Sequence, residues 1–250
     1  MAINISLNYS PNFNPYKRKK NQIEFIIFHY TGMKKESAAI NRLTKIQSQV
    51  SSHYLIKNNG EVINLVPDLY IAWHAGISAW KNFNSLNKYS IGIEISNPGH
   101  EFNYKKFSTK QINSLIRLSK YLIKRYKINP KNILGHSDIS PDRKKDPGEK
   151  FPWEYLAKKN IGLWHKIEKK MLKNFRENKI DHFSQKAFLS NIYKIGYSRK
   201  SVKKIDQKKY QAFLIKSFQR RYRQELVDGK IDKECLLISN NLIKKNINLT

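Results

Sequence analysis

The 250-residue sequence contains a single cysteine, Cys235. One cysteine excludes an intramolecular disulfide and any zinc site that is built from several cysteines. The chain has no apolar run of roughly eighteen residues, which is the length that a transmembrane helix needs. Its N-terminal segment lacks a basic start followed by a continuous apolar stretch, so we expect neither a signal peptide nor a membrane span. A cytoplasmic location is therefore expected, with the periplasm, reached by a non-standard route, as the alternative.

Acidic residues are also scarce. The sequence has 19 Asp and Glu against 48 Lys and Arg, which gives a formal net charge of +29. Such an excess favours polyanionic partners such as nucleic acid, anionic membrane or an acidic cell-wall polymer. Charge alone does not choose among these partners, and a lysine-rich composition is equally typical of an ordinary solvated surface.

Two apolar segments predict neighbouring strands of a buried sheet. The run at 25–28 in "QIEFIIFHYTG" indicates a strand that is covered on both faces, with His29 at its end. In "SIGIEIS", residues 90–96, isoleucine alternates with small and polar residues. This alternation gives the strand one apolar face and places Glu94 on the other face.

Helical spacing of apolar residues predicts helices over residues 37–50 and 108–126, the second capped by Ser108 or Thr109. "SSHYLIKNNGEVINLVP" predicts a hairpin, with Asn58, Asn59 and Gly60 supplying positive φ angles in its turn. Strands that alternate with helices over about the first 160 residues indicate an α/β fold with a mixed central sheet flanked by helices.

The C-terminal part has a different character. After Trp164 a lysine-rich stretch leads into three helical patterns without a convincing strand, which predicts a small three-helix domain. These patterns cover residues 184–195, 201–222 and 232–245. We therefore expect a catalytic domain at 1–168, a linker at 169–183 and a helical domain at 184–250.

Three residues are candidate metal ligands: His29, His136 after "NILG", and Asp146 in "KKDPG". Two imidazoles and one carboxylate suit zinc, and three protein ligands leave a fourth position for water in a catalytic site. The spacing of these residues is weak evidence, because a lone histidine is usually structural and the chain has no HExxH helix.

Six short motifs in order point to a family. "FHYTG", "SSHYLI", "AWHAG", "SIGIEISN", "ILGHSDISPDRKKDPG" and "FPW" together resemble the zinc-dependent N-acetylmuramoyl-L-alanine amidases of the AmpD and AmiD type. That family shares its fold with phage lysozyme-type amidases and peptidoglycan recognition proteins. The resemblance covers residues from about 20 to 165.

The resemblance implies a role for each matching residue. It implies one zinc ion per chain, held by His29, His136 and Asp146. Glu94 matches the family's catalytic glutamate and Lys144 its catalytic lysine, while Lys145 occupies the variable position between Lys144 and the aspartate.

The implied reaction is hydrolysis of the amide between the lactyl group of N-acetylmuramic acid, in its ordinary or anhydro form, and L-alanine of the stem peptide. It would serve peptidoglycan recycling or remodelling. Glu94 would deprotonate the attacking water and return the proton to the leaving amine. Zinc and Lys144 would stabilise the negative charge that develops on the carbonyl oxygen.

The remaining histidines receive weaker assignments. His53 and His74 match recurrent family positions and are expected to lie in the pocket or the core rather than to bind metal. Trp73 and His74 are candidates for lining a groove for sugar and peptide. No function is assigned to His100, His165 and His182.

Residues 218–243 resemble the "FQ…DG…D" signature of small three-helix peptidoglycan-binding modules. Core packing alone would explain the same apolar residues. As a binding module, this part would hold the enzyme near its polymer. Its deletion after about residue 180 would then weaken activity on intact sacculi more than on soluble muropeptides.

Two other classes of protein stay open at this point. A non-catalytic peptidoglycan-recognition module would keep the fold but lose metal ligands or catalytic groups, whereas all five positions are filled in this chain. A basic nucleic-acid-binding protein would fit the charge, but no recognition motif for nucleic acid is present. Peptidoglycan or muropeptide fragments are the expected partners, and nucleic acid is not.

Overall fold

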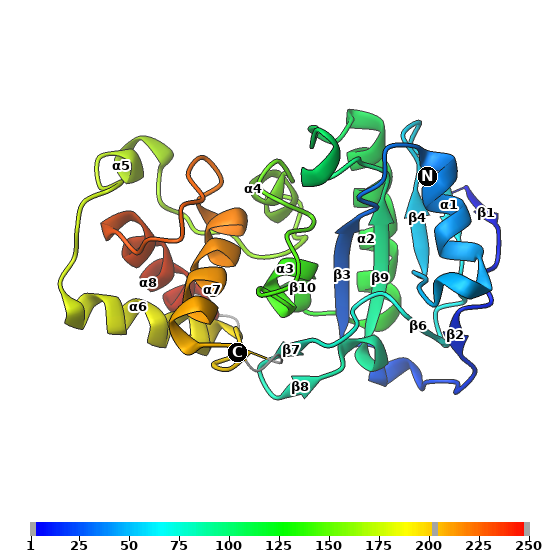
Figure 1. The fold of residues 1–250 in the computed structure, drawn as a ribbon, viewed down its shortest axis with the longest axis horizontal. Helices are drawn as coiled ribbons and strands as arrows, with labels where there is room; N and C mark the ends of the chain where they lie inside the picture. Colours follow the sequence, from blue (N-terminus) through cyan, green and yellow to red (C-terminus); the bar gives the residue numbers. More distant parts are fainter. Residues whose placement is uncertain (1–3, 202–204, 248–250) are drawn as a thin grey trace.

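The structure, a computed structural model, describes residues 4–201 and 205–247. A six-stranded sheet occupies the N-terminal part of the molecule (Figure 1). Across the sheet the strands are β1 (Ile5–Leu7), β5 (Val62–Asn64), β4 (Tyr54–Ile56), β9 (Ser90–Ile95), β3 (Phe25–Tyr30) and β10 (Ile133–Gly135). The β4–β5 pair is antiparallel and the other neighbouring pairs are parallel, so the predicted mixed sheet is confirmed.

Two short antiparallel ribbons and several helices complete the fold. The ribbons pair β2 (Phe13–Asn14) with β6 (Ile71–Ala72) and β7 (Ala79–Trp80) with β8 (Phe83–Asn84). The α-helices are α1 (Glu36–Thr44), α2 (Thr109–Tyr126), α3 (His136–Ile139), α4 (Trp153–Ala157), α5 (Lys169–Lys173), α6 (His182–Ile195), α7 (Gln207–Tyr222) and α8 (Lys233–Ile247). None of the described helices combines the length and apolar composition that a membrane crossing requires.

The central strands follow directly from their sequences. Every residue of β3 except Tyr30 is buried, as the continuous apolar run predicts for a strand covered on both faces. β3 pairs with β9 in a register that sets His29 beside Glu94. β10 lies on the other side of β3 and pairs Gly135 with Phe28, so His136 emerges beside His29. Sheet topology therefore brings residues about a hundred positions apart to one edge.

Helix α2 begins and ends as its sequence predicts. The hydroxyl of Ser108 accepts a hydrogen bond from the Gln111 amide at 3.2 Å, and the Gln111 side chain accepts one from the Ser108 amide at 2.9 Å. This capping box satisfies donors that the first helical turn leaves open. The buried stripe of α2 includes Leu115, Leu118 and Leu122, which join the main hydrophobic core.

The prediction of a helix over residues 37–50 was wrong at its C-terminal end. Helix α1 stops at Thr44, and Ile46–Ser48 form a short 3₁₀ turn. The side-chain amide of Asn12 donates hydrogen bonds to the carbonyls of Lys45 and Val50 at 2.8 and 2.9 Å. These bonds from a distant segment hold the chain in a loop where local spacing alone favours a helix.

The predicted hairpin is present as β4 and β5, but its turn needs positive φ at one residue only. Gly60 has a φ of 87°, whereas Asn58 and Asn59 are not among the residues with positive φ. The Asn59 side chain instead accepts a hydrogen bond from the Glu61 amide at 2.9 Å. Asparagine thus closes this turn by a side-chain hydrogen bond rather than by a left-handed backbone.

The three predicted C-terminal helices are present as α6, α7 and α8. Helix α7 begins at Gln207 rather than near 201, and residues 202–204 of that predicted helix lie outside the described residues. Part of the predicted linker 169–183 is helical, because it contains α5. In the same segment Arg176 pairs with Glu234 of α8 at 2.7 Å.

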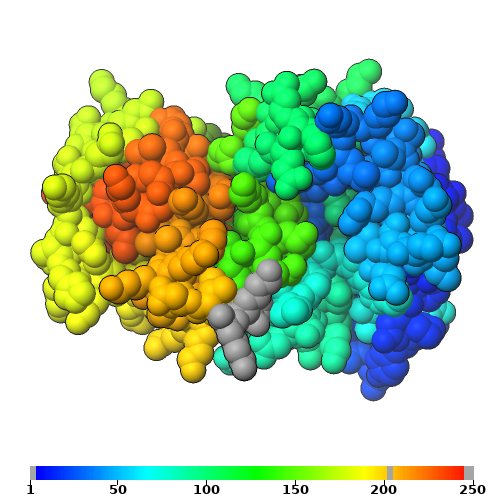
Figure 2. All heavy atoms as spheres, in the orientation of Figure 1, coloured from blue at the N-terminus to red at the C-terminus, as the bar shows by residue number. Residues whose placement is uncertain are grey.

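The C-terminal helices pack directly against the rest of the chain. Their buried side chains belong to the same hydrophobic cluster as the sheet, a cluster that includes both Phe28 and Phe218. The rings of Trp80 and Tyr197 lie 4.9 Å apart, and Gly196 leaves no room for a Cβ against Trp80. On the face shown in Figure 2, the orange atoms of the C-terminal part adjoin the green atoms of the N-terminal part. The predicted division into independent domains stays a prediction.

A continuous core predicts that the whole chain unfolds in one cooperative transition. Replacing buried Phe188 of α6 by alanine, or buried Leu118 of α2, would then lower the same melting temperature, at a cost of about 2–5 kcal/mol each. Calorimetry checks this through the ratio of calorimetric to van't Hoff enthalpy. Two transitions, of which only one responds to Phe188→Ala, would instead show separate unfolding of the two predicted domains.

Candidate metal centre

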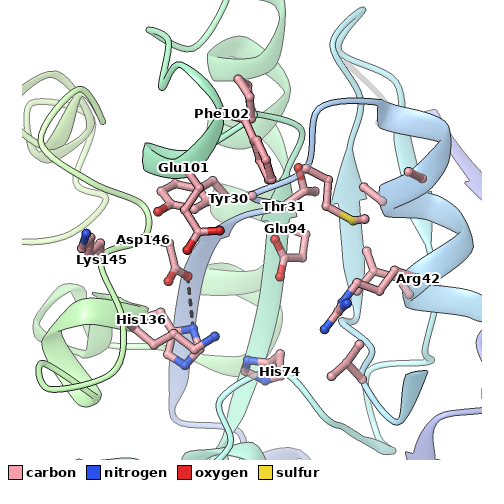
Figure 3. A pocket seen from close by; sticks show the side chains of 18 of the residues that line it. Tyr30, Thr31, Arg42, His74, Glu94, Glu101, Phe102, His136, Lys145 and Asp146 are labelled. Atoms are coloured by element: carbon pink, nitrogen blue, oxygen red, sulfur yellow. Dashed lines mark hydrogen bonds and ion pairs between the residues drawn. The ribbon is translucent and has the colours of Figure 1, made fainter. Parts of the chain in front are cut away.

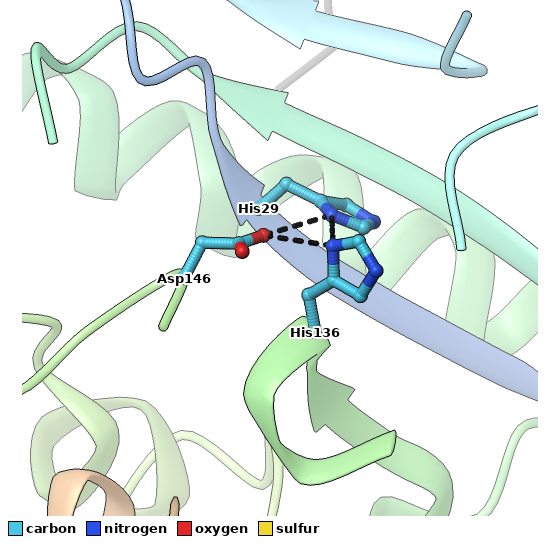
Figure 4. A group of neighbouring side chains, drawn as sticks. All are labelled: His29, His136 and Asp146. Atoms are coloured by element: carbon cyan, nitrogen blue, oxygen red, sulfur yellow. Dashed lines mark hydrogen bonds and ion pairs between the residues drawn. The ribbon is translucent and has the colours of Figure 1, made fainter. Parts of the chain in front are cut away.

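Three side chains meet at the edge of the sheet where β3 and β10 end (Figure 4). His29 Nδ1 lies 2.9 Å from His136 Nδ1 and 3.0 Å from Asp146 Oδ2. His136 Nδ1 lies 3.1 Å from the same carboxylate oxygen. All three residues are buried. The structure thus brings together the three residues that the sequence analysis selected as metal ligands.

Hydrogen bonds on the outer side of His136 determine which ring nitrogen carries its proton. His136 Nε2 lies 3.0 Å from the carbonyl oxygen of Ala75, which can only accept. A neutral imidazole has one N–H, so this contact places the proton on Nε2 and leaves a lone pair on Nδ1.

A longer chain of hydrogen bonds determines in the same way which ring nitrogen of His29 carries the proton. The Ser90 hydroxyl donates to the Leu86 carbonyl at 2.6 Å and therefore accepts from His74 Nε2 at 3.2 Å. His74 Nδ1 then accepts from His29 Nε2 at 3.0 Å. Burial and the neighbouring His29 hold the pKa of His74 well below its usual value, consistent with a neutral ring. His29 Nδ1 is left as a bare acceptor.

When both rings are neutral, the centre of the cluster holds three acceptors that face one another. Burial and the neighbouring His136 lower the pKa of His29 to about 4. Burial raises the pKa of the Asp146 carboxyl, but the positive charge and the hydrogen bonds that the His136 and His29 rings offer in their protonated forms outweigh burial and hold that pKa well below its usual value, so Asp146 is ionised. Two neutral imidazoles and a carboxylate are the deprotonated forms that a metal needs. The residues fit a divalent cation with nitrogen and oxygen ligands, such as zinc.

Gly92 explains the "IGIE" pattern of the neighbouring strand. A Cβ at this position would lie 2.4 Å from Cγ of His74, so only glycine leaves room for the ring. The Gly92 amide also donates to His53 Nδ1 at 3.0 Å, and His53 Nε2 lies 3.0 Å from the Tyr70 carbonyl. His53 is thus a buried core residue, as expected, and His74 supports His29 from behind.

Glu94 lies beside His29 in the strand register, and its side chain faces the groove. One of its carboxylate oxygens, Oε2, is buried and has no hydrogen-bond partner. Burial and the nearby Asp146 raise the pKa of Glu94 to about 8, while the charge of Lys144 opposes them. A carboxyl with such a pKa can take up and release a proton near neutral pH, and its unpartnered oxygen lies where a substrate or a water molecule can reach it.

The loop before Asp146 carries three consecutive basic residues with different surroundings. Arg143 donates to the Ile77 carbonyl at 2.7 Å and to the Ala75 carbonyl at 3.2 Å, which ties this loop to the "AWHAG" segment. Lys144 is half-buried in the groove wall, and its charge acts on both Glu94 and His29. Lys145 also lines the groove but is exposed.

A groove of about 940 Å³ lies over the cluster, within the size range of small-molecule sites. Figure 3 shows Arg42 reaching from α1 toward the floor where Glu94 and His74 lie, with Phe102 and Glu101 on the opposite wall. Trp73 also lines the groove and is 36% exposed, and its contact with sugar or peptide stays a prediction.

His100 is a groove residue that the sequence analysis left without a role. Its Nδ1 accepts from the Tyr30 hydroxyl at 2.9 Å, and its Nε2 lies 2.9 Å from Glu149. This bridge connects the loop after β9, which contains His100, to the loop after Asp146, which contains Glu149. The signal for it was the position of "PGHEF" just after β9, at the same sheet edge as His29. His165 and His182 do not line the groove.

A buried site with two histidines and one carboxylate, open to a groove and flanked by a further carboxyl and an ammonium group, defines a candidate metallohydrolase. Comparison with known proteins makes the class specific. A family model described as N-acetylmuramoyl-L-alanine amidase matches residues 19–149. The chain belongs to the N-acetylmuramoyl-L-alanine amidase family, whose members are hydrolases.

Individual relatives agree with this assignment. N-acetylmuramoyl-L-alanine amidase AmiD of Escherichia coli (strain K12) is 35% identical over 238 residues, which cover 90% of this chain and 83% of that relative. The 1,6-anhydro-N-acetylmuramyl-L-alanine amidase AmpD of Haemophilus influenzae is 42% identical over 113 residues, which cover 44% of this chain and 59% of that relative.

Solved structures show the same likeness over most of the chain. The structure of E. coli AmiD in complex with the substrate anhydro-N-acetylmuramic acid-L-Ala-D-gamma-Glu-L-Lys matches with a TM-score of 0.77 and 34% identity, covering 93% of this chain and 92% of that one. AmpDh3 of Pseudomonas aeruginosa matches with a TM-score of 0.76 and 32% identity, covering 93% and 94%. The fold described above is therefore that of these amidases.

The close fit between Gly92 and His74 gives a test of the metal centre. In Gly92→Ala the new Cβ would lie 2.4 Å from Cγ of His74, so the His74 ring should be displaced. His29 would then lose the hydrogen bond from its Nε2 to His74, which orients its ring. We expect zinc affinity to fall roughly 10- to 100-fold, the usual effect of changing a group that orients a metal ligand. Competition with a chromophoric chelator measures this.

Gly60→Ala is the matched control for Gly92→Ala. It would also place a Cβ too close to backbone, 2.9 Å from the Lys110 carbonyl oxygen, and it lies in the β4–β5 turn away from the ligands. It should lower stability and leave zinc affinity unchanged. Equal losses of affinity in the two variants would contradict a specific role of the His74 packing.

Proposed function

We propose that this chain is a zinc-dependent amidase that cleaves the bond between the lactyl group of N-acetylmuramic acid and L-alanine of the stem peptide. The observation that carries the proposal is the convergence of the ligand atoms of His29, His136 and Asp146 beside the unpartnered carboxyl oxygen of Glu94. One zinc ion per chain is the cofactor that this ligand set and the family favour.

The relatives indicate the substrate class. AmiD of E. coli has been solved with anhydro-N-acetylmuramic acid-L-Ala-D-gamma-Glu-L-Lys, and AmpDh3 of P. aeruginosa with an anhydromuramic pentapeptide. A γ-linked glutamate keeps its α-carboxylate free, so such a peptide is anionic near the scissile bond. The groove of this chain offers the complementary charge, since Lys34, Lys35 and Arg42 line the wall formed by α1 and the turn before it. We infer anhydromuropeptides as substrates.

Each catalytic residue has a defined task in this proposal. Glu94 binds the attacking water through its carboxylate, takes its proton, and passes that proton to the departing alanine nitrogen. Lys144 holds its ammonium near Glu94 and stabilises the negative charge on the carbonyl oxygen more strongly in the tetrahedral state than in the planar substrate. Zinc, when bound, supplies Lewis-acid polarisation of the carbonyl and lowers the pKa of water.

Groove walls orient the substrate around this chemistry. Trp73 offers a partly exposed indole to the apolar face of the sugar. His74 is buried in the groove floor, where its Nδ1 accepts from His29, so we assign it a supporting role in place of substrate contact. Orientation by such walls converts attack by water into an effectively intramolecular step.

The rival functions have less support. A non-catalytic recognition module has no need for Glu94 and Lys144 beside an intact ligand set. Nucleic-acid binding would draw on the positive charge alone. The cytoplasmic location and the role of the C-terminal helices as a peptidoglycan-binding module stay predictions from the sequence.

A direct assay tests the proposed activity. Purified protein incubated with a defined anhydromuropeptide should release free stem peptide, because water adds across the lactyl–alanine amide. A chelator should abolish this release, and added zinc should restore it. Mass spectrometry of the products identifies the cleaved bond. Release at another bond, or no release from metal-loaded protein, would overturn the proposal.

The role of Glu94 has its own test. Glu94→Gln keeps the size of the side chain but removes the general base, so turnover should fall by roughly 100- to 10,000-fold with zinc still bound. The control is Glu61→Gln, which changes an exposed carboxylate on the distant β4–β5 hairpin and should leave turnover unchanged. Steady-state kinetics together with zinc content separates loss of the base from loss of the metal. Near-normal turnover in Glu94→Gln would remove Glu94 from the mechanism.

A further inference from the structure

A buried ion pair connects the C-terminal helices to the segment that carries His136. Arg221 of α7 donates from Nη1 to Asp138 Oδ2 at 2.5 Å, and both side chains are almost completely buried. Asp138 belongs to the single turn of α3, two residues after His136. An ion pair removed from water is retained only where further hydrogen bonds satisfy both partners.

Asp138 is fully satisfied. Besides Arg221, its Oδ2 accepts from the Gly135 amide at 2.8 Å, and its Oδ1 accepts from the Tyr197 hydroxyl at 2.7 Å. Gly135 immediately precedes His136, so this carboxylate fixes the backbone on both sides of the histidine. Two of its three donors come from the C-terminal part of the chain.

Arg221 makes two further contacts besides the ion pair, although its Nε is buried without a hydrogen-bond partner. Its Nη2 donates to the Ile133 carbonyl at 2.9 Å, and its guanidinium lies 4.2 Å from the centre of the Trp153 ring. Arg221 therefore contacts strand β10 through Ile133 and helix α3 through Asp138. A planar group with several donors suits this double contact, which a lysine could not make.

A second contact joins α7 to both ends of the metal site. The Ser217 hydroxyl donates to the Ser137 carbonyl at 2.7 Å, and the Ser137 amide donates to the Asp146 carbonyl at 2.8 Å. Ser137 lies next to His136 in the chain (Figure 4 shows the turn from which His136 projects). One face of α7 thus contacts the residue that follows His136, and through that residue it is connected to the backbone of Asp146.

We propose that Arg221 is a positioning residue of the metal centre, which acts through Asp138 to hold His136 Nδ1 where it meets His29 and Asp146. The C-terminal helices are then a structural part of the metal site and not only an accessory for binding polymer. This inference rests on the zinc site of the proposed function. It differs from a general stabilising role, because it ties Arg221 to metal affinity and ligand geometry in the folded protein.

The test compares two buried arginines at the end of the same helix. Arg221→Met removes the charge and keeps an unbranched apolar chain against Trp153. Arg223→Met removes a guanidinium that is equally buried and pairs with Asp232 and Asp228, away from α3. Both changes should reduce the free energy of unfolding, since each leaves a carboxylate without its partner.

Zinc affinity and the cobalt spectrum distinguish the two variants. In Arg221→Met we expect a roughly 10- to 100-fold weaker zinc affinity, by chelator competition, and a changed visible spectrum of the Co²⁺-substituted protein. In Arg223→Met both should equal those of the unchanged protein, at a temperature where urea unfolding shows both apoproteins folded. Arg221→Met with unchanged affinity and spectrum, or an equal loss in both variants, would overturn the inference.

If Arg221→Met does not fold, Tyr197→Phe tests whether the contacts to Asp138 affect zinc affinity. It deletes one donor to Asp138 and leaves the ion pair intact, and it should weaken zinc affinity about threefold or more, as the loss of one hydrogen bond to a charged group predicts. Unchanged affinity in Tyr197→Phe would then count against the inference. Failure of the unchanged protein to bind zinc would instead refute the metal part of the proposed function, so the two failures are distinguishable.

Discussion

Three lone pairs that face one another in a buried space are the feature on which the rest of the structure depends. When both rings are neutral, the lone pairs of the two Nδ1 atoms and of the Asp146 oxygen face one another at about 3 Å and repel, in buried surroundings that screen charge weakly. A neutral ring could avoid this repulsion by carrying its proton on Nδ1. The Ala75 carbonyl and His74 Nδ1 disfavour that tautomer, because they accept hydrogen bonds from the Nε2–H groups of His136 and His29. The fold thus holds three lone pairs close together, and a bound divalent ion would remove the repulsion between them.

This constraint gives a physical meaning to several sequence motifs. "AWHAG" supplies both outer partners, the His74 ring and the Ala75 carbonyl. "IGIE" supplies the gap at Gly92 that the His74 ring fills, and Glu94 two residues later, on the same face of the strand. "KKDPG" supplies the third ligand. The motifs lie far apart in the chain, and the parallel pairing of β3 with β9 and β10 brings them together.

Local patterns predicted those parts of the protein that local forces determine. The apolar run of β3, the alternation in β9 and the N-terminal cap of α2 at Ser108 are all consequences of short-range spacing, and they were predicted correctly. The end of α1 was not, because Asn12 from a distant segment binds the carbonyls of Lys45 and Val50, which follow the helix. The ligands could be selected by residue type and by family resemblance. The bridge through His100 could not, because neither Tyr30 nor Glu149 is near it in sequence.

The excess of basic residues separates into two groups with different physical roles. Among the described residues the buried set includes Arg18, Arg221 and Arg223 but no lysine. Each of these arginines joins separate segments or the two sides of a turn. Arg18 donates to five backbone carbonyls between residues 68 and 90. A guanidinium can satisfy several acceptors in one plane, whereas an ammonium group buried in the same place would lose its hydration without equivalent replacement.

The lysines therefore carry most of the positive field at the surface, including the groove wall that faces an anionic peptide. The excess of basic residues thus reflects two properties, attraction of the substrate and stabilisation of the buried structure, which the sequence alone does not separate. The surface lysines bear on attraction of the substrate, and their effect should be screened by salt. The buried arginines bear on the architecture that holds α3, and salt should affect them little, because they are shielded from solvent.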